Sequence, residues 1–382
     1  MADYKAFADL LESVSFSSID DPQTINESMR KIQSWIVSNI PSKLFRYRSF
    51  KDESFPADLK INEVWGSSIL TFNDPLECTP CVDRRSFWNN FISMQSRENR
   101  KRIWEGLRDK SLQPILCKVL QEDKAKQICE DAANCSFEDF LTQSDEFLLM
   151  IGKDLKPFIS EADFIRVFRL TGMLRNVACF SESSTSFPMW GHYAKGHTGY
   201  CLEYDLKQAF SKNEELGIRF SFNDIKDSFI SPVIYSEHRF DSTKSFSTFV
   251  LNTFFKMIGY EQQALVYPDV LSSFKAVITK AKDWEYEKEW RLVSEFSSED
   301  IKTHSLIANI KPTAVYVGAR MSESHEKGLY SVCKQESIPC YKMVVNFLSQ
   351  EFGMTPVGFD QYLNFRSSDS NENQPCLNDL VC

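Results

Sequence analysis

The chain has 382 residues, of which 42% are hydrophobic and 25% charged, and its formal net charge is −9. This composition is ordinary for a globular protein and excludes disorder of the whole chain. The negative charge argues against a protein coated in nucleic acid or bound to an anionic membrane, although a local basic patch remains open.

The first thirty residues lack the basic start and apolar stretch of a secretory leader, so we expect a cytoplasmic protein. No 18 uncharged apolar residues run together, which predicts no membrane span. The eleven cysteines are scattered, and we expect them to be reduced thiols. Cys78 and Cys81 form the only CxxC, and without a second pair or a nearby histidine we expect no metal site.

The predicted elements alternate between helices and short strands. After DDP at 20–22, apolar residues recur every three or four positions from Ile25 to Ile40, which predicts a helix that Pro41 ends. Helical patterns return at 87–172 and 243–283. Segments rich in β-branched or aromatic residues predict strands at 43–48, 66–72, 177–182, 199–205, 232–235, 289–295, 313–317 and 340–345.

Together these elements predict an α+β fold with a mixed, mostly antiparallel sheet core and large helical insertions. We expect an N-terminal helical segment over 1–42, one α+β domain over 43–350 with helical insertions at about 84–172 and 243–283, and a disordered tail over 367–382. Between Arg84 and Lys126 the first insertion holds eleven basic and five acidic residues. That stretch is either a nucleic-acid surface or a solvated helical face.

The densest polar constellation is MWGHYAKGHTGYCLEYD at 189–205, which holds two of the five histidines. Its side chains could line a site, or its rings could be core residues whose histidines bond to backbone carbonyls. The HxxxxH spacing does not match the one-face pair of helical metalloproteases. The polar and aromatic residues in question are Trp190, His192, Tyr193, His197, Glu203 and Asp205.

A second cluster is WEYEKEWR at 284–291. In a strand, side chains alternate between faces, so three glutamates would share one face with an arginine. Burying that set without a purpose is costly, whereas a solvent-facing edge would cost nothing, and both interpretations stay open. The residues of this face are Glu285, Glu287, Glu289 and Arg291.

The third cluster is LFRYRS at 44–49. Strand alternation would place Arg46 and Arg48 on one face, with Tyr47 opposite. Two guanidiniums in that arrangement could clamp phosphates, although exposed strands often carry two basic residues.

Several motifs, taken in order, resemble the bacterial domain-of-unknown-function 2971 (DUF2971) family. They are LFRYRS, SSILTFNDPLE at 67–77, CFSE at 179–182, the 189–205 segment and WEYEKEWRL at 284–292. The resemblance spans about 43–320 and implies kinship without a defined reaction, with a role in bacterial defence or as a toxin as an expectation. The candidates for substrate contact or structural support are Asn73, Asp74, Glu77, His197, Glu203 and Arg291.

An ordered trio also resembles one branch of the NAD-dependent ADP-ribosyltransferases: a strand arginine, a Ser-Thr-Ser and a Glu-x-Glu. The resemblance implies that the arginine holds NAD, that the serine run braces it, and that Glu289 stabilises the ribosyl cation while Glu287 orients the acceptor. His192 and Tyr193 are further catalytic candidates, and Trp190 is a further cofactor contact. The residues expected to bind NAD are Arg46, Arg48, Ser184, Thr185, Ser186 and Trp190.

Two other functions stay open. His192, His197 and the carboxylates could form an acid–base site for binding or processing nucleic acid beside the basic helices. Alternatively, the aromatic motifs lock the fold of a non-catalytic interaction module. The partner would be a macromolecular target or nucleic acid, and the sequence does not indicate the oligomeric state. The chain contains neither GxSxG nor a P-loop motif.

Overall fold

The computed structural model describes residues 4–15, 17–50, 60–83, 87, 96–155, 175–212, 229–248, 252, 266, 268–269, 271–295 and 304–368. Its strands are β1 (Leu44–Arg48), β2 (Glu63–Ser68), β3 (Arg175–Ser181), β4 (Tyr200–Tyr204), β5 (Phe229–Pro232), β6 (Ile234–Ser236), β7 (Thr279–Ala281), β8 (Glu289–Glu295), β9 (His304–Asn309), β10 (Ala314–Val317), β11 (Cys340–Val345) and β12 (Met354–Gly358). Its α-helices are α1 (Tyr4–Ser13), α2 (Pro22–Asn39), α4 (Arg97–Arg108), α5 (Gln113–Val119), α6 (Glu122–Asn134), α7 (Phe137–Leu155), α9 (Phe187–Tyr193), α10 (Leu206–Lys212), α12 (Ser272–Ile278), α13 (Glu323–Gln335) and α14 (Phe359–Ser368). Two 3₁₀ helices are η2 (Ile69–Thr71) and η5 (Lys282–Glu287).

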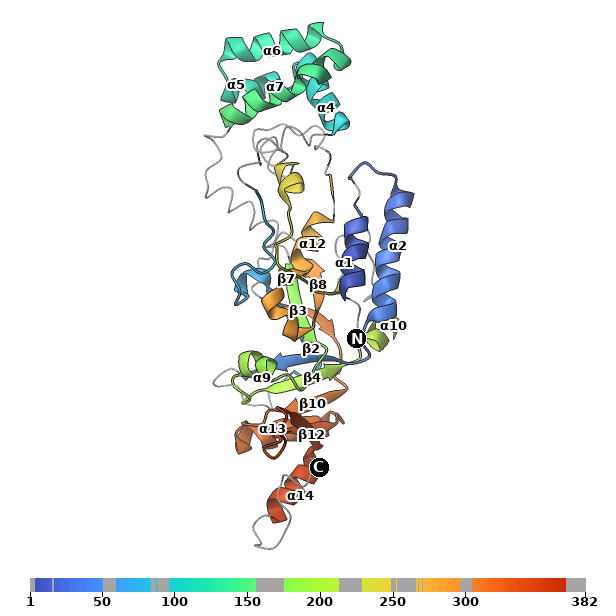
Figure 1. The fold of residues 1–382 in the computed structure, drawn as a ribbon, viewed down its shortest axis with the longest axis vertical. Helices are drawn as coiled ribbons and strands as arrows, with labels where there is room; N and C mark the ends of the chain where they lie inside the picture. The colour runs from blue at the N-terminus through green and yellow to red at the C-terminus, as the bar shows by residue number, and fades with distance from the viewer. Residues whose placement is uncertain are drawn as a thin grey trace.

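A ten-stranded sheet runs through the described part of the chain (Figure 1). Its strand order is β12-β11-β10-β4-β1-β3-β2-β9, and β8 pairs beside this path with both β3 and β5. The pairing of β10 with β11 is parallel, with α13 as the crossover, and the other pairings in this sheet are antiparallel. The predicted α+β class with a mixed, mostly antiparallel sheet is therefore confirmed.

The N-terminal helices pack on this sheet. The Asp21 side chain accepts hydrogen bonds from the N–H groups of Gln23 and Thr24, and Pro22 occupies the first turn, so α2 begins where its sequence predicts. The Tyr4 hydroxyl of α1 donates to Glu182 Oε1 at 2.7 Å, and the Trp290 indole of β8 donates to the same oxygen at 3.0 Å. Glu182 thus joins the first helix to the sheet.

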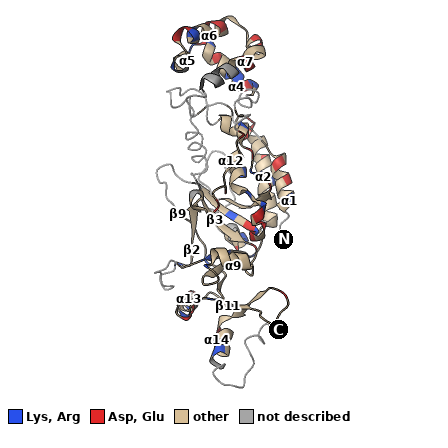
Figure 2. Ribbon diagram, turned by 60° about the vertical axis from the view of Figure 1, so that its left-hand side comes forward, with Lys and Arg blue, Asp and Glu red and all other residues tan. Residues whose placement is uncertain are grey.

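Helices α4 to α7 pack around a hydrophobic core of their own and lie at one end of the molecule (Figure 1). Basic and acidic residues are interspersed along the ribbons of these helices in Figure 2. Arg97 pairs with Glu138, and Arg100 lies 2.5 Å from Asp145. Among the described residues, no helix has the length and apolar content to cross a membrane.

Several element predictions were wrong in detail. The strand expected at 66–72 is shifted to β2, and its second half is η2. The stretch 279–283, expected to be helical, instead holds β7 and the start of η5, because β7 pairs with the distant β6. Strands β9 and β12 were not predicted. Helix α14 continues to Ser368, and the rest of the expected tail, like parts of both expected insertions, lies outside the described residues.

Candidate functional site

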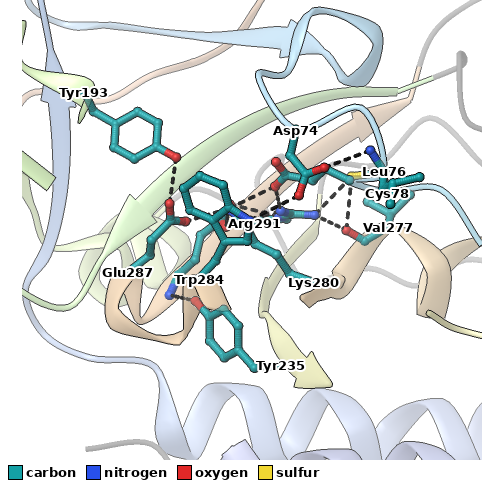
Figure 3. A network of polar contacts seen from close by, with 12 residues as sticks. Asp74, Leu76, Cys78, Tyr193, Tyr235, Val277, Lys280, Trp284, Glu287 and Arg291 are labelled. Atoms are coloured by element: carbon teal, nitrogen blue, oxygen red, sulfur yellow. Dashed lines mark hydrogen bonds and ion pairs between the residues drawn. The ribbon is translucent and has the colours of Figure 1, made fainter. Parts of the chain in front are cut away.

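Five charged side chains lie buried together where β8 begins: Glu77, Lys280, Glu287, Glu289 and Arg291, which we call the ion cluster (Figure 3). Lys280 Nζ lies 2.5 Å from Glu287, 2.9 Å from Glu289 and 3.1 Å from Glu77. Arg291 Nε donates to Glu289 Oε1 at 2.9 Å, and Arg291 Nη2 pairs with Glu77. Each of the five side chains is at most 4% exposed.

Local backbone geometry explains how these residues meet. Strand alternation in β8 places Glu289 and Arg291 on one face of the sheet. Helix η5 ends at Glu287 and is capped by Lys288, whose φ of 45° is left-handed, and this turn brings Glu287 into the same cluster. Lys280 comes from β7, which is held by its parallel pairing with β6.

The expected four-residue strand face is wrong at its start. Residues 282–287 form η5, so the strand alternation begins only at Glu289, and Glu285 is exposed. The third carboxylate of the ion cluster is Glu77, which follows the NDP turn. There the Leu76 N–H donates to Asp74 Oδ1 at 2.8 Å and fixes the path of the chain.

The ion cluster separates the pKa values of its two neighbouring glutamates. Burial raises the pKa of Glu287 to about 7, and the charge of Glu289 adds to the rise although Lys280 opposes it. Burial acts in the same direction on Glu289, but Arg291 and Lys280 outweigh it and hold the pKa of Glu289 well below its ordinary value. Glu289 is therefore a fixed negative charge, whereas Glu287 exchanges a proton near neutral pH.

Two tyrosine hydroxyls touch these glutamates (Figure 3). The Tyr193 hydroxyl donates to Glu287 Oε1 at 2.6 Å, and the Tyr235 hydroxyl accepts from the Glu289 N–H at 2.7 Å. Burial raises the pKa of both tyrosines, so both hydroxyls keep their protons. Tyr193 is only half-buried and connects the buried Glu287 with more exposed residues of α9 and η5.

Three rings next to the ion cluster form what we call the aromatic surface: His192, Trp284 and Tyr286. Their centroids are 6.5 Å apart for His192 and Trp284, 6.5 Å for His192 and Tyr286, and 6.1 Å for Trp284 and Tyr286. The Trp284 indole donates to Asp74 Oδ2 at 3.1 Å, and Lys280 Nζ lies 5.2 Å from its ring centre. His192 is exposed and the other two rings are half-buried.

Arg46 lies on the opposite face of the sheet from Glu289. Phe45 pairs with Ser181 and Ser181 pairs with Glu289, so these three side chains share a face that excludes Arg46. The Arg46 guanidinium instead donates to the Trp65 carbonyl, and burial lowers its pKa to about 10. The structure therefore does not bring this arginine together with the Glu-x-Glu motif.

Arg48 is exposed at the end of β1, on the same face as Arg46. The Ser-Thr-Ser segment instead lies beside the buried Trp190, because the indole donates to the Ser184 carbonyl at 2.8 Å. Thr185 N–H donates to Ser183 Oγ, and Ser186 directly precedes α9. Trp190 is fully buried, so it supports this loop from the core and is not open to a cofactor.

The remaining candidates separate into different environments. His197 stacks on Trp190 with a centroid distance of 6.2 Å and is not one of the rings of the aromatic surface. Burial lowers the pKa of His197. Glu203 accepts from Tyr316 at 2.6 Å and from Thr313 at 2.9 Å, away from the ion cluster. Asn73, which is exposed, hydrogen-bonds the Tyr193 hydroxyl, and Asp205 caps α10 by accepting from Gln208 N–H at 2.8 Å.

Sequence reasoning missed four residues that surround the glutamates: Lys280, Tyr235, Cys78 and Cys179. The Cys78 sulfur accepts from Arg291 at 3.0 Å, and burial raises the pKa of both thiols. Cys78 lies in the CxxC and Cys179 begins the CFSE motif, but neither pattern places its cysteine beside the glutamates, because pairing between distant segments brings the four residues together. Among the described residues, no group of three His, Cys, Asp or Glu side chains could hold a metal ion.

The fold and this site define an α+β protein with a buried ion cluster beside an aromatic surface. Residues 189–292 match the model of the family described as protein of unknown function (DUF2971), so this segment of the chain is similar to that family. The match contains Tyr193, Lys280 and the Glu-x-Glu motif, whereas Arg46 and Glu77 lie outside it. No curated protein and no solved structure matches the chain.

Proposed function

We propose that the chain is an ADP-ribosyltransferase-like enzyme that cleaves the N-glycosidic bond of NAD and transfers the glycosyl group to an acceptor. The observation that carries the proposal is the pair Glu287 and Glu289, whose pKa values are driven apart around Lys280. Two carboxyl groups with separated pKa values are the usual basis of acid–base chemistry at neutral pH.

The contacts favour roles for Glu287 and Glu289 that differ from those expected from the sequence. Both oxygens of Glu289 are bonded by Arg291 and Lys280, so its role is to fix the charge of the site. Glu287 bonds Tyr193, whose half-buried hydroxyl is the better candidate to touch an acceptor. The acceptor would give its proton to the Tyr193 oxygen, while Tyr193 gives its own proton to Glu287.

The site offers contacts for a base of NAD, but Arg46 does not contact its phosphates there. The aromatic surface offers rings on which the base of a nucleotide can stack. Arg46 is buried on the other face of the sheet, so we assign it no contact with the phosphates. NAD is proposed as the substrate, and the proposal includes no metal.

The test is nicotinamide release from NAD by the purified chain, with mass spectrometry of cellular macromolecules to identify an acceptor. Glu287→Gln should fold normally and lose roughly two to four powers of ten in rate, because it cannot receive a proton. A matched control is Glu326→Gln, which alters another buried carboxylate paired with a lysine, Lys342, far from the ion cluster in sequence. Full activity of folded Glu287→Gln would reject the assignment.

The nucleic-acid alternative gains no support from α4. Arg97 and Arg100 are paired with acidic residues, and Arg108 lies over the Trp104 ring at 4.8 Å. The proposed glycosyl transfer to a macromolecule agrees with the cytoplasmic location expected from the first thirty residues, and with the toxin or anti-phage defence role expected from the family resemblance. The toxin or defence role is part of the same proposal and would fail with it.

A further inference from the structure

We infer that the aromatic surface of His192, Trp284 and Tyr286 binds a planar heteroaromatic cation, the positively charged leaving group of an N-glycoside. This inference rests on the proposed function for the reaction, but its binding claim can be tested separately. It adds a ligand class and a location that the Glu-x-Glu motif does not supply.

The three rings of the aromatic surface are held beside one another by their elements and contacts. They come from α9 and η5, and neighbouring centroids lie 6.1 to 6.5 Å apart, so the rings touch and form one continuous apolar area. Asp74 fixes the Trp284 indole by a hydrogen bond, and the Leu76 N–H in turn fixes Asp74. A ligand would therefore meet a preorganised ring.

The charges near the aromatic surface also favour a cation. With all groups ionised, the ion cluster has a net charge of −1, since three carboxylates face two cations. The charge of Lys280 next to Trp284 is neutralised by the carboxylates within 3.1 Å of it. Asp74 is half-buried beside the aromatic surface, and η5 carries the exposed Asp283 and Glu285, whereas its one lysine, Lys282, pairs with Glu237. Aromatic faces and excess carboxylates both attract a cation.

The protonation states of the two glutamates also limit which leaving group fits the site. Hydrolysis of an ordinary O-glycoside uses one carboxyl group as an acid and a second as a base or nucleophile. Here Glu289 is locked in its ionised form, so Glu287 is the one glutamate of the pair that exchanges a proton near neutral pH. A site with one such group suits a leaving group that departs without being protonated.

A cationic N-heterocycle meets that condition. When its bond to the sugar carbon breaks, the electron pair stays on the ring nitrogen, and the ring leaves as a neutral molecule. The positive charge passes to the sugar until the acceptor oxygen bonds to it. The acceptor proton reaches Glu287 through Tyr193, so charge and protons balance. Because the departing ring is neutral, its attraction to the aromatic surface falls and release follows.

The experiment compares the binding of 1-methylnicotinamide, a planar cation, with that of neutral nicotinamide, by titration calorimetry on the full chain. Neither probe has a glycosidic bond, so turnover does not interfere. We expect the cation to bind about tenfold more tightly than the neutral ring. Trp284→Leu should abolish this preference. Trp65→Leu is the matched control, because Trp65 is a 41% exposed tryptophan on β2 whose indole donates to Glu63 and not to a residue of the aromatic surface.

His192→Ala keeps the inference testable if Trp284→Leu does not fold, because His192 is exposed and its loss should weaken cation binding severalfold. Equal affinity for the two probes, or a preference that survives both substitutions, would overturn the inference. If the cation binds through Trp284 but no NAD is cleaved, the subsite stands and the proposed reaction fails. If NAD is cleaved without any preference for the cation, the proposed reaction stands and the subsite fails.

Discussion

Glu287→Gln should change how the stability of the protein depends on pH. The pKa of Glu287 rises on folding from its ordinary 4.5 to about 7, chiefly because the carboxyl is buried. Folded protein therefore binds its proton more tightly than unfolded protein, and the stabilising effect is complete below about pH 4.5 and lost as pH rises through 7. The rise corresponds to about 3 kcal/mol of unfolding free energy.

Glutamine cannot ionise, so the unfolding free energy of the variant does not fall in this way as pH rises. Relative to wild type, Glu287→Gln should gain about 3 kcal/mol in unfolding free energy between pH 4.5 and pH 8, with most of the change between pH 5 and 7. The assay is guanidinium unfolding, followed by tryptophan fluorescence, at half-unit pH steps. Glu289→Gln is a second variant for this assay: because the charge of Glu289 adds to the rise of the Glu287 pKa, its removal should move the pH dependence to lower pH. A flat difference for Glu287→Gln would refute the burial argument.

Three further predictions follow from the same contacts. Glu289→Gln should lower the unfolding free energy at pH 7 by about 3–5 kcal/mol, because it leaves Arg291 and Lys280 short of a buried partner; a loss under about 1 kcal/mol in denaturant titrations would contradict this. Arg46→Gln should lower the melting temperature, because a buried donor to the Trp65 carbonyl is weakened, yet leave any nicotinamide release per folded molecule unchanged; selective loss of activity would return Arg46 to the site. Cys78 should react with a thiol reagent such as dithionitrobenzoate only on unfolding, since burial raises its pKa to about 12, and rapid labelling of the native Cys78 in peptide mapping would show otherwise.

The sequence predicted those elements whose signals are local. The capped start of α2 and the bounds of β8 and β11 agree with expectation, because capping residues and β-rich runs act within a few positions. The start of the 284–291 motif is not the predicted strand, and the residue pattern gives no sign of the reason. Lys288 adopts a left-handed conformation, and strand alternation does not extend back across it.

The site was predicted in part. Glu287, Glu289 and Arg291 do meet, and Tyr193 joins them, because each lies in a motif dense in polar residues. Lys280 was missed because the parallel pairing of β6 with β7 places it there. The face of the sheet on which Arg46 lies likewise depends on the register of β1 with β3 and of β3 with β8. A single sequence does not determine that register.

The shared carboxylate of Glu182 has a practical consequence for anyone who shortens the chain. A fragment that began at residue 43, the expected start of the α+β domain, would lose Tyr4 and leave the Trp290 indole as the remaining described side-chain donor to Glu182 Oε1. Trp290 precedes Arg291 in β8, and Glu182 N–H bonds the carbonyl of Lys288. A deletion at the amino terminus would thus disturb contacts of residues directly adjacent in sequence to Glu287 and Glu289. The first helix therefore belongs in any fragment used to assay the ion cluster.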